Sequence, residues 1–242
     1  IYVKFQVEDG KGVLDTDNYI VIWTTTPWTL PGNTGIVVEG EADYSLVETN
    51  RGKLVMATVL VDQIMQVSGI KEYKTLKTVK AGELEGMLCK HPFLDRTSKG
   101  VLGSEDTVAV ELDTGTGAVH CAPSYGKEDY LCGIKNGLDI VVCVDGKGYQ
   151  TEAAGPFAGL YYEKSNEAII TWLEENHYLL HKEKINHSYP HCWRCKNPII
   201  FRATDQWFAS VDKFRDKTIE EIKKVHWVPA WGEDRITSMV ED

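Results

Sequence analysis

The sequence lacks the features that would place it in a membrane or on nucleic acid at large. No apolar run is long enough to cross a bilayer, and the N-terminus does not read as a signal peptide, so we expect a cytoplasmic protein with no membrane partner. Basic residues are fewer than acidic ones: the chain has 26 Lys and Arg and 36 Asp and Glu, which gives a net charge of −10. That balance argues against a general nucleic-acid binder, but it allows a domain that receives only the tip of a nucleic acid.

A disulfide framework is also lacking, although the chain has six cysteines. Four of them stand among apolar neighbours and predict buried free thiols in a reducing compartment: Cys89, Cys121, Cys132 and Cys143. The other two, Cys192 and Cys195, form the only Cys-x-x-Cys. This spacing lets two thiolates hold one metal ion, but zinc needs about four ligands and no second Cys-x-x-Cys is present.

Two histidines, His187 and His191, lie close enough in sequence to Cys192 to serve as further ligands. A complete zinc site and a zinc-ribbon interaction domain therefore stay open as interpretations. A redox pair is disfavoured, because no thioredoxin-like βαβ pattern surrounds the two cysteines.

The pattern of apolar residues predicts a mixed, mainly β protein. Alternating or β-branched runs predict strands at 1–7, 19–23, 34–38, 44–48, 54–56, 74–79, 107–111 and 139–144. Helical spacing predicts helices at 60–67, 128–136, 165–178 (with Ser165 as N-cap) and 213–225, with a loop-rich link over 83–93. Many strands with few helices favour a closed or partly closed β-barrel carrying inserted and peripheral helices. The chain starts at Ile1 without a Met and ends in an apolar run, so we expect a piece of a longer protein.

A first candidate site is the threonine run at 24–26, between a buried strand and a loop with two prolines. Pro27 and Pro31 remove backbone donors and fix φ, which makes the loop stiff. Three hydroxyls held in this way can surround a small polar ligand. The alternative is a threonine-rich edge strand, and the stiff loop favours the ligand site.

A second candidate site is the stretch 115–130, which combines glycines, His120 and Asp129 ahead of a predicted helix. Glycines let the backbone approach a ligand, and a loop between rigid elements is a common place for a site. The alternative, a buried histidine and a helix-capping aspartate, stays open from this stretch alone.

Three segments together resemble one family. Trp-Thr-Thr-Thr-Pro-Trp-Thr-Leu-Pro-Gly-Asn at 23–33 resembles the threonine-rich peptide of the editing domain in class I aminoacyl-tRNA synthetases for branched aliphatic amino acids. Gly-Thr-Gly-Ala-Val-His-Cys-Ala-Pro-Ser-Tyr-Gly-Lys-Glu-Asp-Tyr at 115–130 resembles the second editing motif. The segment 188–195, with 202–204 and 206–208, looks like the part that follows this domain in the isoleucyl members. The resemblance covers essentially the whole chain.

The resemblance implies an excised editing insertion that hydrolyses valine wrongly esterified to the isoleucine tRNA. The His-x-Gly-His and Lys-Met-Ser-Lys-Ser signatures of the ATP-using catalytic body are missing, and 235–242 resembles the return into that body. We therefore expect an editing domain over 1–183 and a return segment over 184–242. A second pocket is needed because one methylene is worth only about 1–3 kcal/mol of discrimination, as isoleucine and valine themselves exemplify.

The resemblance also implies roles. Asp129 would bind the α-ammonium of the substrate, and His120 would wall the side-chain pocket. Thr24, Thr25 and Thr26 would hold the terminal adenosine, the ester and an attacking water. Further substrate-binding positions are Trp23, Asn33, Thr29, Gly117, Ala118 and Val119. No serine or cysteine nucleophile is matched, so water is expected to attack directly.

The implied partners are the 3′ end of charged isoleucine tRNA, its valine ester and the rest of the synthetase. No cofactor is implied for editing. Cys192 and Cys195 would be half of a four-cysteine zinc site in the longer protein. Many relatives carry glycine-histidine where this chain has Ser124-Tyr125, so we assign no catalysis to position 125. A non-catalytic module that binds the tRNA 3′ end and a valyl-type editing domain stay open as alternatives.

Overall fold

The computed structural model describes residues 1–186 and 188–241, so His187 lies outside the described residues. The chain divides into two compact units, residues 1–203 and residues 204–242. The division between 183 and 184 expected from the sequence concerns the domain border in a longer protein and stays a prediction.

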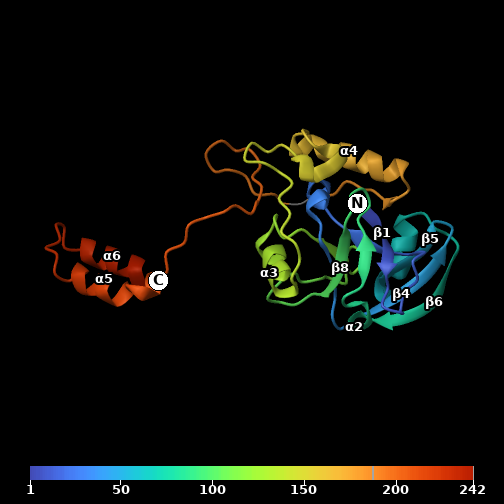
Figure 1. The fold of residues 1–242 in the computed structure, drawn as a ribbon, viewed down its shortest axis with the longest axis horizontal. Helices are drawn as coiled ribbons and strands as arrows, with labels where there is room; N and C mark the ends of the chain where they lie inside the picture. The colour runs from blue at the N-terminus through green and yellow to red at the C-terminus, as the bar shows by residue number, and fades with distance from the viewer. Residues whose placement is uncertain (187, 242) are drawn as a thin grey trace. The chain divides into compact units, whose positions relative to one another are not determined.

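The first unit is built on a closed six-stranded barrel (Figure 1). Around the barrel the order is β1 (Tyr2–Asp9), β7 (Leu88–Lys90), β8 (Thr97–Leu102), β3 (Gly35–Val38), β9 (Ala118–Cys121) and β2 (Asn18–Trp23). The pairing of β1 with β2 closes the ring. The pairs β3–β8 and β2–β9 are parallel, which makes the sheet mixed. The expected fold class, a closed barrel with added helices, is confirmed.

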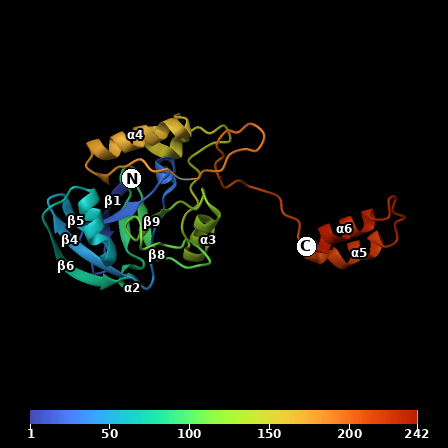
Figure 2. The ribbon, with the colours of Figure 1, turned by 180° about the vertical axis from the view of Figure 1, so that it is seen from behind.

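Further strands extend the sheet beyond the barrel on both sides. On one side β5 (Gly52–Ala57), β4 (Asp43–Thr49) and β6 (Tyr73–Lys80) continue from β2, and on the other β10 (Leu179–His181) pairs with β1. The added elements are η1 (Pro27–Gly32), η2 (Thr58–Leu60), α1 (Val61–Val67), α2 (Ala81–Leu84), α3 (Lys127–Asn136), η3 (Glu152–Phe157) and α4 (Tyr162–Glu175). Helix α3 lies on the opposite side of the barrel from β4 and β6, and α4 lies across one end (Figures 1 and 2).

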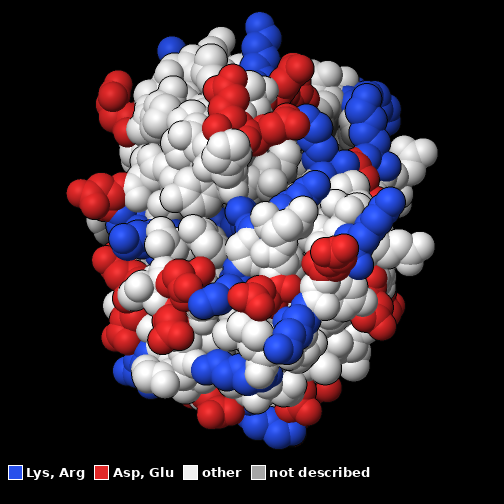
Figure 3. Space-filling view, turned by 90° about the vertical axis from the view of Figure 1, so that its right-hand side faces the viewer, with Lys and Arg blue, Asp and Glu red and all other residues white. Residues whose placement is uncertain are grey.

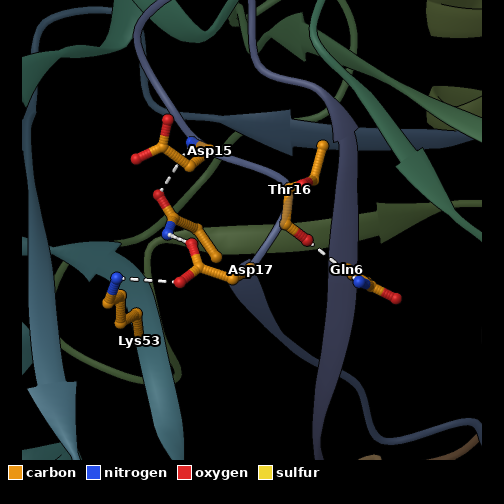
Figure 4. Close-up of polar contacts among 6 residues, drawn as sticks. Gln6, Asp15, Thr16, Asp17 and Lys53 are labelled. Atoms are coloured by element: carbon orange, nitrogen blue, oxygen red, sulfur yellow. Dashed lines mark hydrogen bonds and ion pairs between the residues drawn. The ribbon is translucent and has the colours of Figure 1, made fainter.

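A large cluster of buried apolar residues holds the first unit together. Phe5, Ile20, Ile36 and Leu54 are completely buried within one cluster, as β-branched and aromatic residues at the predicted strand positions require. The four cysteines expected to be buried free thiols are buried and free. On the outside, the β1–β2 connection is tied by polar contacts such as Lys53 Nζ to Asp17 Oδ2 at 2.8 Å (Figure 4).

Several predicted elements are wrong. The strands expected at 107–111 and 139–144 are irregular. Val108 and Val110 are buried in a cluster with Cys132 of α3, but among the described residues no strand pairs with them. Strands β7 and β8 were not predicted, and β7 lies in the stretch expected to be a loop. Ser165 is not an N-cap, because α4 starts at Tyr162 and the Ser165 hydroxyl donates to the Tyr162 carbonyl at 2.6 Å.

The second unit contains η4 (Val211–Lys213), α5 (Arg215–Ile222) and α6 (Gly232–Glu241). Helices α5 and α6 are joined by Arg215 Nε donating to the Val240 carbonyl at 3.0 Å. The helix expected at 213–225 corresponds to α5. Across the residues that the structure describes, every helix is too short or too polar to span a membrane.

Candidate functional site

A pocket of about 320 Å³ opens where the two sequence motifs meet. Strand β9 lies between β2 and β3, with Trp23 in register with Val119 and Ile36 opposite His120, so the barrel brings the threonine run and the glycine-rich stretch together. The expected site residues that line the pocket are Trp23, Thr24, Thr25, Thr26, Thr29, Gly117, Val119, His120 and Asp129. Asn33 and Ala118 do not line it. The roles expected for these residues stay predictions.

The glycine loop at 115–117 forms one wall of the pocket, and its backbone conformation requires glycine at positions 115 and 117. Gly115 and Gly117 have φ of +72° and +71°, and a Cβ on Gly117 would lie 2.4 Å from the Ala57 Cβ. The loop is also fastened to β5, since the Ala57 N–H donates to the Thr116 carbonyl at 2.9 Å. The pocket wall here is therefore bare backbone held rigidly.

Gly117→Ala should destabilise the protein far more than Gly137→Ala. Both positions have left-handed φ, but a Cβ at Gly137 meets nothing within 4 Å. We expect a loss of about 1 kcal/mol for Gly137→Ala and about 2–5 kcal/mol for Gly117→Ala, where overpacking is added to strain. Urea unfolding of the two variants measures the difference, and equal losses would show that the Ala57 contact is not limiting.

The threonine segment is held by its own side chains and by the elements around it. The Thr26 N–H donates to Thr24 Oγ1 at 3.1 Å, and the Thr29 hydroxyl donates to the Thr26 carbonyl at 2.8 Å. From outside, Asn166 Oδ1 accepts the Trp28 N–H at 2.9 Å. Thr25 is exposed, and within the described residues its hydroxyl has no hydrogen-bond partner. The loop thus presents a fixed row of hydroxyls with Thr25 free to meet a ligand.

His120 is a buried, neutral wall of the pocket. Its ring contacts Thr29 Oγ1 through Nε2 at 3.1 Å and Asn33 Nδ2 through Nδ1 at 3.4 Å. Because an amide NH₂ only donates, Nδ1 must accept and Nε2 must carry the proton. Burial lowers the pKa of His120 to about 4. An imidazole with both nitrogens engaged and such a low pKa suits a fixed surface better than a general base.

Asp129 is the carboxylate of the pocket. It stands in the first turn of α3, and its Oδ1 accepts the Ala122 N–H at 2.8 Å, which fixes the side chain toward the pocket. Burial raises the pKa of Asp129, because desolvation outweighs the hydrogen bonds it accepts. Within the described part of the chain, no Lys, Arg or His forms an ion pair with it. A half-buried carboxylate without a cation is suited to bind one from a ligand.

Asn33 and Ala118, the two expected residues outside the lining, support it from behind. Asn33 is completely buried, and its Nδ2 donates to the Gly35 carbonyl at 2.9 Å as well as to His120. The Ala118 N–H donates to Thr116 Oγ1 at 3.3 Å and so belongs to the glycine loop. Asn33 therefore lies behind the histidine wall, whereas the sequence analysis expected a substrate-binding residue.

Tyr125 lines the pocket, although the sequence analysis assigned it no role there. Its hydroxyl accepts the Cys143 N–H at 2.6 Å, and its ring packs edge-on against Trp28 at 5.1 Å between centroids. The other lining residues outside the expected set are Ala109, Glu111, Thr114, Gly115, Thr116 and Ala122. The only sequence signal for Tyr125 was its place within the glycine-rich stretch 115–130.

Cys192 and Cys195 do not gather further ligands. Within residues 1–186 and 188–241, no group of three or more His, Cys, Asp and Glu side chains is placed to hold a metal ion. His191 uses its Nδ1 on the Lys196 carbonyl at 2.5 Å. Two thiols supply half of what zinc needs, so the described residues do not fit a complete zinc site.

The buried histidines should make the protein sensitive to mild acid. Burial lowers the pKa of His120 to about 4 and of His91, which donates to the Leu30 carbonyl, to about 3. The unfolded chain takes up protons below about pH 6.5 that the folded state refuses, so stability is complete above that pH and falls as the pH drops toward the lowered values. At pH 5 each histidine should cost about 2 kcal/mol. Unfolding free energies at pH 7 and pH 5 measure the loss, and His91→Gln should remove about half of it.

The fold is similar to that of known structures. It is similar to the crystal structure titled GlLeuRS-CP1, with a TM-score of 0.60 and 15% identity over 76% of this chain and 100% of that chain. It is also similar to the cytosolic leucyl-tRNA synthetase editing domain of P. knowlesi, with a TM-score of 0.54 and 12% identity over 73% of this chain and 93% of that one. The barrel is that of synthetase editing domains.

Sequence comparison gives the family. The family described as tRNA synthetases class I (I, L, M and V) matches residues 6–242, and the chain belongs to it. The chain is 51% identical over 248 residues to isoleucine–tRNA ligase of Caldicellulosiruptor bescii and 50% identical over 242 residues to that of Geobacillus thermodenitrificans. Each match covers 100% of this chain and 26% of the relative, so the chain spans about a quarter of these proteins. The family expected from the motifs is confirmed.

Proposed function

We propose that this pocket is an editing site that hydrolyses valine from the 3′ end of mischarged isoleucine tRNA. The single observation that carries the proposal is Asp129, a half-buried carboxylate that forms no ion pair with any described residue and lines the same pocket as the threonine hydroxyls and His120. An aminoacyl ester offers what these groups lack: an ammonium for the carboxylate, and ribose hydroxyls and an ester for the threonines. The relatives, isoleucine–tRNA ligases, support the choice of tRNA.

The proposed chemistry is direct attack by water. The water oxygen bonds to the ester carbonyl carbon, the bond from that carbon to the ribose oxygen breaks, and the water proton ends on the ribose oxygen. Asp129 anchors the ammonium, and the threonine row orients the water and the ester, which is catalysis by positioning. Cys121 is unsuited as a nucleophile, because it is buried and its thiol donates to the Asp129 carbonyl at 3.6 Å. Its contact with Cys132 and its burial also raise the pKa of the thiol.

The pocket would distinguish valine from isoleucine by the size of the amino-acid side chain. His120 is fixed from both ring nitrogens, so the wall cannot yield to an extra methylene. Isoleucine would be excluded by this wall, while valine would fit. His120, although buried like a core residue, would thus be the residue that excludes the larger substrate.

No cofactor enters the proposal for editing. In the longer protein, Cys192 and Cys195 would join further ligands around zinc, and a separate body would use ATP to attach isoleucine. Cytoplasmic residence is part of the same proposal. On the face drawn in Figure 3, acidic and basic side chains are interspersed, in line with a domain that receives only a tRNA end rather than a long nucleic acid.

Deacylation of purified valyl-tRNA(Ile) by the chain, and by the full-length protein that contains it, tests the proposal. We expect loss of valine from the tRNA and retention of isoleucine under the same conditions. Binding of charged and uncharged tRNA with equal affinity and no hydrolysis would instead identify a non-catalytic tRNA-end module. Faster hydrolysis of threonyl-tRNA(Val) than of valyl-tRNA(Ile) would point to valyl-type editing.

A further inference from the structure

A continuous buried chain of hydrogen bonds runs from β8 to the threonine row. It begins at Ser98, which is completely buried and donates its hydroxyl proton to Asn33 Oδ1. It continues through Asn33 and His120 to Thr29, and then through Thr26 Oγ1, 3.3 Å from Thr29 Oγ1, to Thr24 Oγ1 at a further 3.3 Å. Ser98 does not line the pocket, and the proposed function assigns it no role.

The direction of each bond follows from the fixed groups. The Gly35 carbonyl can only accept, so the Asn33 amide turns its NH₂ toward Gly35 and His120 and its oxygen toward Ser98. Nδ1 of His120 then accepts, and Nε2–H donates to Thr29. The Thr29 hydroxyl donates its hydrogen bond to the Thr26 carbonyl, so in the Thr26–Thr29 pair the Thr26 hydroxyl must be the donor. By the same reasoning the Thr24 hydroxyl donates to Thr26 Oγ1.

We propose that Ser98 is a positioning residue of the site: by satisfying the Asn33 oxygen it holds the amide against His120, fixes the ring in its Nε2–H form, and so sets the direction of the whole hydroxyl row. This inference rests on the proposed function for its effect on hydrolysis, but its effect on the histidine does not. Without Ser98, the buried Asn33 oxygen loses its donor, and the amide no longer holds one place.

The direction of these hydrogen bonds gives the threonines different roles toward a ligand. The hydroxyl protons of Thr24, Thr26 and Thr29 are all directed within the row or to its backbone. Thr29 Oγ1 already accepts from His120 Nε2–H and from the Thr26 hydroxyl, so both of its lone pairs are used. The oxygens of Thr24 and Thr26 each keep one free lone pair, so they meet a ligand as acceptors, suited to the protons of an attacking water. Thr25, whose hydroxyl has no partner within the described residues, is the threonine free to donate to an ester oxygen.

Nitrogen-15 NMR of histidine-labelled chain tests the positioning directly. In the wild type, His120 should show one protonated nitrogen, Nε2, and one bare nitrogen, Nδ1; a protonated Nδ1 overturns the proposal at once. Ser98→Ala should shift the Nδ1 resonance and bring in a second tautomer. Asn33→Asp, which presents only acceptors, should move the proton to Nδ1 and provides a second test if Ser98→Ala folds poorly.

Ser45→Ala is the matched control for stability. Ser45 is also buried and bonds one side chain, Thr58 Oγ1 at 2.9 Å, but it lies outside the pocket. Both variants should lower the melting temperature similarly, and only Ser98→Ala should change the His120 signals. Unchanged His120 signals in a folded Ser98→Ala would refute the positioning role.

Deacylation by the full-length protein gives the functional arm. Ser98→Ala should slow valyl-tRNA(Ile) hydrolysis by about 3- to 10-fold and raise the isoleucyl-to-valyl ratio, while Ser45→Ala should change neither. If no variant or wild type hydrolyses the ester yet the tautomer shifts as described, the proposed function fails and the positioning role stands. If hydrolysis is strong and Ser98→Ala leaves rate, ratio and tautomer unchanged, the positioning role fails alone.

Discussion

Asp129→Ala is expected to abolish measurable hydrolysis of valyl-tRNA(Ile). The carboxylate is half-buried, its pKa is raised by desolvation, and it has no cationic partner within the described residues, so its interaction with a substrate ammonium would be strong. Removing one partner of such a pair costs about 2–5 kcal/mol, which is about 30- to 5,000-fold in rate. Single-turnover deacylation with the full-length protein measures the loss.

Asp129→Asn separates the charge from the structural bond. Asp129 Oδ1 accepts the buried Ala122 N–H, so Asp129→Ala also leaves that donor unpaired and should lose about 1–3 kcal/mol of stability. Asparagine keeps an acceptor there and should fold within about 1 kcal/mol of wild type, the scale of a charge in a first helical turn. If Asp129→Asn hydrolyses the ester at the wild-type rate, Asp129 is a structural residue and does not bind the ammonium.

His120→Ala is expected to relax size exclusion more than it slows hydrolysis. Removing the ring adds volume at the wall where the extra methylene of isoleucine would lie, so the variant should deacylate its own correct isoleucyl-tRNA. The neutral ring, with a pKa of about 4 and both nitrogens engaged, gives little reason to expect the 10²–10⁴-fold loss of a general base. The ratio of isoleucyl to valyl deacylation is the quantity to measure.

His91→Ala is the control for simple loss of a buried histidine. His91 is buried to 4% exposure, compared with 8% for His120, and it lies outside the lining of the pocket. Both variants should lower the melting temperature, but His91→Ala should leave the isoleucyl-to-valyl ratio at its wild-type value. A wild-type ratio in His120→Ala would show that the ring is a core residue and not the sieve.

Strands with strong local patterns could be predicted from the sequence. The buried strand β2, with Tyr19 to Trp23 mostly β-branched or aromatic, is an example. Strand β8 could not be predicted, because Lys99 and Gly100 in its middle disfavour a strand, and it exists through its pairing with β3 and β7. The reverse holds at 107–111, where alternation is present but no strand lies alongside to pair with it.

In the site, too, features with a local sequence pattern could be predicted and features that depend on distant residues could not. Nine of the eleven site residues named from the motifs line the pocket, since residue type and spacing carry the chemistry. Burial behind the pocket, however, depends on distant chain: Asn33 lies behind His120 because Ser98 and Gly35 take up its amide. The wall made by Tyr125 depends on Gly32, where any Cβ would lie 2.5 Å from the tyrosine ring. Contacts between residues so far apart in sequence leave no local pattern to read.

The most direct test of the central claim is a crystal structure of the chain with a non-hydrolysable valyl-adenosine analogue. The account predicts the analogue in the pocket between the threonine row and the start of α3, with its ammonium on Asp129, its isopropyl group against His120 and its ribose hydroxyls on Thr24, Thr25 and Thr26. The isoleucyl analogue should not bind there at the same concentration. An analogue bound outside this pocket, or bound with its ammonium away from Asp129, would contradict the account.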